Sequence, residues 1–137
     1  MNPFRRTAHS LGLALALLTA GAPSVLASPA DPSPVVFALD ASRSLSATES
    51  RATADLTKVL LAQLPATATS GVLAFDDEVR WLARPGENGP GGTSEAIAAL
   101  DALTPTGRFT VLNDGLIEGL RALPDGGVLV LLSDGMD

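Results

Sequence analysis

The chain has 137 residues, with 9 basic and 15 acidic side chains, a formal charge of −6 and no cysteine. This acidic balance argues against nucleic acid or an anionic membrane surface as a partner. The single histidine is His9, near the N-terminus, so the rest of the chain has neither imidazole nor thiol. A Ser-His-Asp or Cys-His hydrolase within that part of the chain is therefore excluded.

The N-terminal segment has the organisation of a secretory signal peptide. Arg5 and Arg6 precede the apolar stretch Leu11 to Ala20, and Val25-Leu26-Ala27 provides a small-residue cleavage site. The apolar stretch is short for a bilayer span, although an uncleaved anchor is an alternative. We therefore expect residues 1–27 to be removed on export to the periplasm or beyond.

The remainder divides into a spacer and one small domain. Residues 28–33 (SPADPS) are rich in proline and serine and predict an extended linker. Residues 34–137 are expected to form the domain. After cleavage 7 basic and 15 acidic residues remain, a charge of −8, and we expect no membrane contact.

The first apolar run of this domain ends in a cluster of oxygen-bearing side chains. Val35 to Leu39 predicts a parallel strand buried on both faces, and Asp40, Ser42 and Ser44 follow it at alternate positions. In open α/β sheets, ligands bind outside the carboxyl ends of the strands. Carboxylate and hydroxyl oxygens are hard donors, which suit Mg²⁺, Mn²⁺ or Ca²⁺.

Helices and strands alternate along the rest of the chain. A capping box, Ser46-Ala47-Thr48-Glu49, predicts a helix start. A short antiparallel hairpin is expected next, with Asp76 and Asp77 as turn residues. Two helices and a second buried strand follow. The predicted segments are a helix with Ala52, Leu56, Val59 and Leu60 on its apolar face, strands at 71–75 and 78–82, a helix with Ile97, Leu100 and Leu103, a helix with Leu112, Leu116, Leu120 and Leu123, and a strand at 128–132.

The resulting order, β-α-β-β-α-α-β, predicts an α/β fold whose sheet is mostly parallel with one antiparallel edge strand. Gly115 and Gly119 lower helix propensity, and close approach of their helix to the sheet is a reason to keep them. Trp81, on the edge strand, is expected to pack against a helix.

Three separated pieces of the chain converge on one site. The motif Asp40-x-Ser42-x-Ser44 by itself is compatible with ordinary turn and cap residues. Thr110, however, precedes a helix, and Asp134 follows the second buried strand. If the two buried strands are neighbours, all five side chains can face one point and hold a divalent cation.

Four segments carry a resemblance to a known family. VVFALDASRS, GVLAFDDEV, PTGRFTVLNDGLIEGL and VLVLLSDG together resemble the von Willebrand factor type A domain with its metal-ion-dependent adhesion site. The resemblance implies a Rossmann-like α/β fold with helices on both faces of the sheet. It also implies that Ser42, Ser44 and Thr110 bind the metal directly, and that Asp40 and Asp134 hold it mostly through water.

Two features depart from the family pattern. The family often has two glycines before the threonine, where this chain has Arg108 and Phe109, so Thr106 is an alternative ligand. Family domains also continue beyond the last metal aspartate. We therefore expect residues 34–137 to be the N-terminal part of such a domain, with the strand at 128–132 left as an unpaired apolar edge.

The function expected from these features is that of a secreted or periplasmic, non-catalytic module, which binds an acidic side chain of a protein partner through Mg²⁺, Mn²⁺ or Ca²⁺. The alternative is a Mg²⁺-dependent phosphatase or phosphotransferase with Asp40 as nucleophile. That enzyme would need a second acid where Ser42 stands and a lysine to hold the phosphate, for which Lys58 is the only candidate beyond the signal segment. A third alternative is a chain from an interrupted reading frame, without a function of its own.

Overall fold

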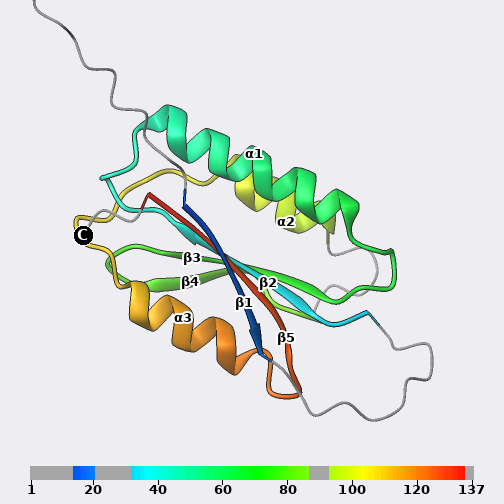
Figure 1. The fold of residues 1–137 in the computed structure, drawn as a ribbon. Helices are drawn as coiled ribbons and strands as arrows, with labels where there is room; N and C mark the ends of the chain where they lie inside the picture. The colour runs from blue at the N-terminus through cyan, green and yellow to red at the C-terminus, as the bar shows by residue number, and fades with distance from the viewer. Residues whose placement is uncertain (1–13, 21–31, 87–92, 135–137) are drawn as a thin grey trace, which may run out of the picture.

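A five-stranded sheet in the order β1-β5-β2-β3-β4 forms the centre of the molecule (Figure 1). The computed structural model describes residues 14–20, 32–86 and 93–134. The strands β5, β2 and β3 run parallel, while β1 and β4 pair antiparallel at the two edges. The elements are β1 (Ala14–Ala20), β2 (Val35–Asp40), α1 (Ala47–Gln63), β3 (Ser70–Phe75), β4 (Val79–Ala83), α2 (Thr93–Asp101), α3 (Leu112–Arg121) and β5 (Gly127–Ser133).

The predicted α/β class and the predicted element order from β2 onward are confirmed. The sheet differs from the prediction at its β5 edge. The strand at 128–132 was expected to be unpaired, but Ala14–Ala20 pairs with it along its whole length, from Ala14 opposite Ser133 to Ala20 opposite Gly127. An exposed strand edge leaves peptide groups without partners, and an apolar segment able to extend satisfies them.

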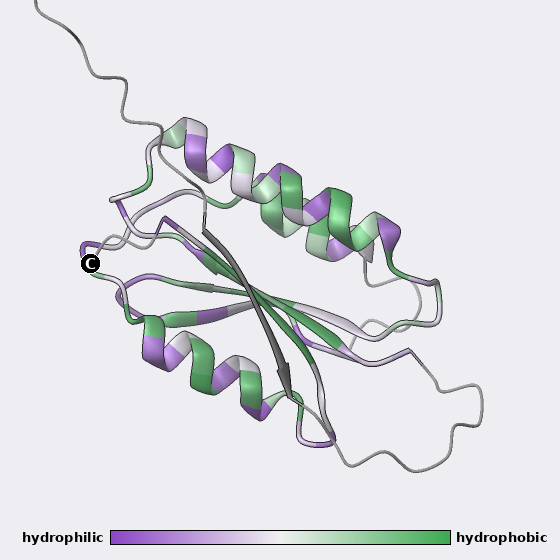
Figure 2. Ribbon diagram, viewed as in Figure 1, coloured by the Kyte–Doolittle hydropathy of each residue, from purple (hydrophilic) through white to green (hydrophobic). Residues whose placement is uncertain are grey.

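Alternate residues of the central strands serve two separate cores, as the two-residue period of a strand requires. Phe37 and Leu39 of β2 pack with α1 and α2 on one face of the sheet. Val36 and Ala38 pack with α3 on the other face. The helices thus cover both faces, and Figure 2 shows the central strands as the hydrophobic layer between them.

Helix α1 begins where the capping box predicts. Ser46 Oγ accepts from the Glu49 amide (3.2 Å), and Glu49 Oε2 accepts from the Ser46 amide (2.8 Å). The hydrogen bonds from Ser46, its side chain first and then its backbone, lower the pKa of the Glu49 carboxyl. This cap places the helix start at Ser46 and leaves Ser42 and Ser44 outside the helix.

The predicted apolar face of α1 is partly wrong. Val59 is 58% exposed and Ala52 is also exposed, whereas Thr53, Ala54 and Thr57 are buried. Thr57 Oγ1 donates to the Thr53 carbonyl (2.9 Å), which lets a hydroxyl face the core. Small and β-branched residues therefore form the surface that packs on the sheet, and Leu56 and Leu60 lie at its margins.

Helix α3 lies close to the sheet at its two glycines, as predicted. A Cβ on Gly115 would lie 2.9 Å from the Phe75 ring, and one on Gly119 would lie 2.7 Å from Leu129. Of the expected apolar face, Leu112 and Leu116 pack against the core, whereas Leu120 is 43% exposed. Trp81 packs against this helix as predicted, and its Nε1 donates to Glu118 Oε1 (3.0 Å).

Candidate metal site

The candidate site lies where β2 and β5 end side by side. Leu39 pairs with Leu132 across the two parallel strands, so Asp40 and Ser133 are neighbours at the carboxyl edge of the sheet. Ser133 Oγ donates to Asp40 Oδ2 (2.9 Å). The strand order therefore makes neighbours of two residues that are 93 positions apart in the sequence.

Asp40 is a buried carboxylate that no cationic side chain among the described residues pairs with. Its exposed fraction is 1%, and its Oδ1 accepts from the Ser42 amide (2.8 Å). Within residues 14–20, 32–86 and 93–134, no lysine or arginine forms an ion pair with it. Buried charges are normally paired or close to a metal ion, because desolvation is otherwise unfavourable.

The hydroxyl oxygens of the two serines in the motif lie side by side, as two ligands of one metal ion would. Ser42 Oγ and Ser44 Oγ lie 2.8 Å apart, close enough for a hydrogen bond between them. Adjacent oxygens around an octahedral Mg²⁺ would lie about 2.9 Å apart, given metal–oxygen distances of about 2.0–2.1 Å. The spacing of the two hydroxyls therefore fits neighbouring positions around such an ion.

Thr110 lines the same hollow as the two serines. This hollow has a volume of about 600 Å³ and opens between the Asp40 loop and the start of α3. The segment that carries Thr110 joins the Asp40 loop through a bridge between Ser42 and Gly107, with the Arg43 amide donating to the Gly107 carbonyl (2.9 Å). The lining residues are Ser42, Ser44, Arg108, Phe109, Thr110, Val111, Leu112, Asn113 and Asp114.

The alternative threonine does not face this hollow. Thr106 Oγ1 donates to Asp76 Oδ2 (3.4 Å), on the side of β3 and β4. Asp134 directly follows β5 and is half-buried. The structure thus brings Ser42, Ser44 and Thr110 to one hollow. Asp40 is not among the residues that line it but accepts from the Ser42 amide, and Asp134 directly follows the adjoining strand β5.

The donor set fits a hard divalent cation. In the part of the chain that is described, no group of three or more His, Cys, Asp or Glu side chains could hold a metal ion. The predicted set instead consists of three hydroxyls and two carboxylates, all of them hard oxygen donors. Mg²⁺ accepts such donors and retains water where the protein supplies none.

The sequence did not reveal two residues that contact parts of the candidate site. Ser133 was passed over although its hydroxyl orients Asp40, because that contact depends on which strands are neighbours and in which register. Asp77 was interpreted as a turn residue, yet its Oδ1 accepts from the Arg108 and Phe109 amides at 2.8 and 2.7 Å. The Asp-Asp pair where a hairpin favours Asp-Gly was the available signal.

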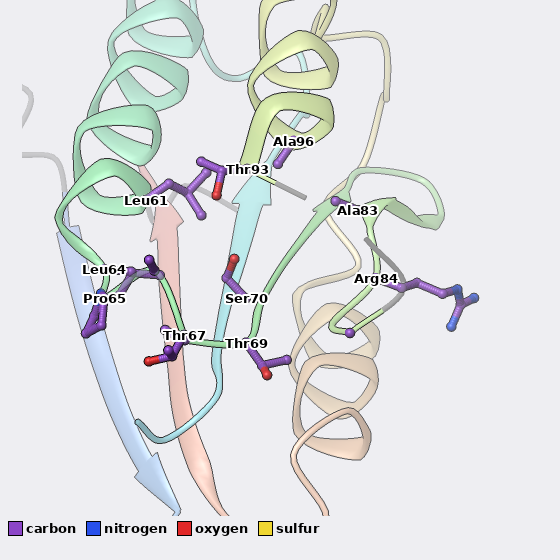
Figure 3. A pocket seen from close by; sticks show the side chains of 13 residues that line it. Leu61, Leu64, Pro65, Thr67, Thr69, Ser70, Ala83, Arg84, Thr93 and Ala96 are labelled. Atoms are coloured by element: carbon purple, nitrogen blue, oxygen red, sulfur yellow. The ribbon is translucent and has the colours of Figure 1, made fainter. Parts of the chain in front are cut away.

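A second hollow lies at the opposite end of the sheet, between the C-terminus of α1, β3, β4 and α2 (Figure 3). Its volume is about 270 Å³, and small apolar and hydroxyl side chains line it. Among its described lining residues the one ionisable side chain is Arg84, which points away from the hollow in Figure 3. It therefore offers no carboxylate donor for a cation.

None of the described helices combines the length and apolar character needed to cross a membrane.

Comparison with known proteins identifies the family. A comparison with curated protein sequences found no match. Among solved structures, proximal thread matrix protein 1 from the mussel byssus is similar, with a TM-score of 0.54 and 18% sequence identity. The alignment covers 76% of this chain and 26% of that one, so this chain spans about a quarter of its length. At this identity the likeness concerns the fold. The family model for the von Willebrand factor type A domain matches residues 35–136, and the chain therefore belongs to this family.

Proposed function

We propose that this chain is a protein-binding module that uses a divalent cation, Mg²⁺ in the first instance, to engage an acidic side chain of its partner. Ser42, Ser44 and Thr110 would bind the ion directly, with Asp40 and Asp134 behind them. The single observation that carries the proposal is the pair of serine hydroxyls 2.8 Å apart, in a loop whose Ser42 amide donates to the buried Asp40 carboxylate. The bound ion would supply an electrophilic position for a carboxylate.

Charge balance supports an acidic partner. Two carboxylates balance a doubly charged ion without excess, and neutral hydroxyls fill further positions without adding negative charge. Arg108 lines the hollow, and Arg43 lies between the two site serines in the sequence. Both are exposed, and neither forms an ion pair within the described residues. Repulsion from the acidic surface is screened beyond about 8 Å at physiological salt, whereas coordination acts at contact.

The side chains that a phosphatase would use are engaged elsewhere, which favours a non-catalytic role. Both oxygens of Asp40 accept hydrogen bonds, and its 1% exposure leaves little room for attack on a substrate. Lys58 binds Asp101 (2.6 Å) and Asp55 (2.8 Å), and the hydrogen bond to Asp101, followed by that to Asp55, raises the pKa of Lys58. Turnover of p-nitrophenyl phosphate with Mg²⁺, lost in Asp40→Asn, would overturn this part of the proposal.

Location outside the cytoplasm is part of the same proposal. It rests on the signal-like residues 1–27, and the cleavage site is expected after Ala27. Cleavage there would remove β1 (Ala14–Ala20) and make β5 an edge strand of the sheet in the mature chain. N-terminal sequencing of the protein recovered from a periplasmic or culture fraction would test it. A mature chain that still begins at Met1 would contradict it.

Direct binding of Mn²⁺, measured by calorimetry, tests the metal site. Ser44→Ala should weaken Mn²⁺ binding by about tenfold, because it removes one hydroxyl ligand. Ser44 is exposed, so its replacement should not disturb the core. Ser33→Ala, also exposed but remote from the hollow, is the matched control and should bind as the wild type does. Equal affinities in all three proteins would place the ion elsewhere.

A further inference from the structure

The segment from Thr106 to Thr110 connects α2 to α3 without regular secondary structure, so contacts with other elements must hold it. Its first part is tied to the Asp40 loop, with the Thr106 amide donating to the Ala41 carbonyl (3.1 Å). Beyond it, the Val111 amide donates to the Asp76 carbonyl (2.9 Å). Between these two anchors the backbone passes the turn between β3 and β4 at the same end of the sheet (Figure 1).

Asp77 holds the middle of this segment. One carboxylate oxygen, Oδ1, accepts from both the Arg108 amide (2.8 Å) and the Phe109 amide (2.7 Å). Hydrogen bonds to an ionised acceptor are shorter and stronger than those between neutral groups. The two amides directly precede Thr110, so these hydrogen bonds restrain the backbone immediately before Thr110.

Gly107 allows the segment to lie directly on the turn. A Cβ at this position would lie 2.2 Å from the Asp76 Cβ and 3.0 Å from the Asp77 amide nitrogen. These neighbours are backbone or close to it and cannot easily move aside. Any larger residue would push the segment away from Asp77 and lengthen the two hydrogen bonds.

Asp76 fixes the turn itself. Its carboxylate is buried, and it binds Arg80 Nη2 (2.9 Å), the Glu78 amide (3.2 Å) and the Thr106 hydroxyl (3.4 Å). Asp77, by contrast, is exposed and directs its carboxylate at the segment. The two adjacent acids thus have different roles, one within the turn and one between the turn and the segment.

We propose that Asp77 is a positioning residue for Thr110, which holds the segment before α3 so that the threonine hydroxyl faces Ser42 and Ser44. This inference rests on the proposed metal-binding function. Asp77 itself would not bind the ion: its Oδ1 is committed to two backbone amides, and it does not line the hollow.

Two substitutions of Asp77 distinguish its role in positioning the segment from the effect of its negative charge. Asp77→Ala removes both the charge and the acceptor, whereas Asp77→Asn removes the charge and keeps an oxygen able to accept. In the full chain, Asp77→Ala should weaken Mn²⁺ binding on the order of 10- to 100-fold, the range seen when a group supporting a metal ligand is lost. Asp77→Asn should retain most of the affinity. Asp125→Ala, at an exposed turn away from the hollow, controls for the loss of one negative charge.

Amide hydrogen exchange of the metal-free protein is the second measurement. Arg108 and Phe109 should exchange faster in Asp77→Ala than in the wild type, and at near wild-type rates in Asp77→Asn. Equal Mn²⁺ affinity in Asp77→Ala and the wild type would overturn the proposal, and so would an equal loss in Asp77→Asn and Asp77→Ala. If the wild type binds no Mn²⁺, the proposed function fails instead, and the exchange rates still decide whether Asp77 holds the segment.

Discussion

Asp40 and Asp76 occupy nearly equivalent positions on neighbouring strands, but their carboxylates have different partners. Asp40 is the last residue of β2 and pairs with Phe75 of β3, so Asp76 lies one residue further along the neighbouring parallel strand. Both carboxylates are buried, with 1% and 2% exposure. Asp76 binds Arg80, whereas Asp40 is bound by a backbone amide and by the Ser133 hydroxyl.

The difference indicates where an external cation fits. A buried carboxylate that has an arginine of its own is already balanced, and a metal ion there would compete with the guanidinium. A buried carboxylate with only neutral hydrogen-bond donors lacks such a partner, and a cation from solution could supply it. Asp76 is therefore an acid that stabilises the fold, and Asp40 is the acid that we propose to support the metal ion.

The largest expected effect separates these two acids by their response to Mg²⁺. At about 100 times its dissociation constant, an ion that binds only the folded state stabilises it by about 2.7 kcal/mol. Asp40→Asn should abolish this gain, while Asp76→Asn should retain it in a protein of lower basal stability. Differential scanning calorimetry with and without Mg²⁺ makes the measurement. A full Mg²⁺ effect in Asp40→Asn would remove the distinction.

The next effect tests whether Arg80 neutralises Asp76. Arg80→Met should lower the free energy of unfolding by about 2 kcal/mol, less than for a fully buried pair because the arginine side chain is 37% exposed. Urea denaturation measures it. Arg121→Met, which loses a pair between the exposed Arg121 and the half-buried Glu118 (3.7 Å), should change stability by less than about 1 kcal/mol.

A double substitution checks the same point. Asp76→Asn combined with Arg80→Met leaves no buried charge at this turn, so it should be more stable than Arg80→Met alone. If the two proteins have equal stability, Arg80 contributes by packing and not by charge.

The smallest effect distinguishes the two threonines of the α2–α3 connection. Thr110→Ala should weaken Mn²⁺ binding by about tenfold, equivalent to about 1.4 kcal/mol. Thr106→Ala removes a long hydrogen bond to Asp76 and should cost at most about 1 kcal/mol of stability, with Mn²⁺ affinity unchanged. Calorimetric titration of both variants makes the comparison, and the reverse pattern would assign the ligand role to Thr106.

Local sequence signals predicted most elements of the fold. The Ser46 capping box marked the start of α1, unbroken apolar runs marked β2 and β5, and the pair Gly115 and Gly119 marked the close approach of α3. Each signal involves only a few neighbouring residues, whose hydrogen bonding and side-chain size do not depend on the rest of the chain. The buried face of α1 was predicted only in part, because Thr53 and Thr57 are buried in preference to the more apolar Val59.

Contacts distant in the sequence depended on tertiary structure. The sequence by itself determined the residue types of the site, an acid and hydroxyls after one strand and a second acid after another, together with the α/β class. Only the tertiary structure decided that Ser133 orients Asp40, that Asp77 holds the backbone before Thr110, and that Ala14–Ala20 pairs with β5. The physical reason is that strand order and register bring together groups 30 to 90 or more positions apart, and no local pattern encodes which of them will meet.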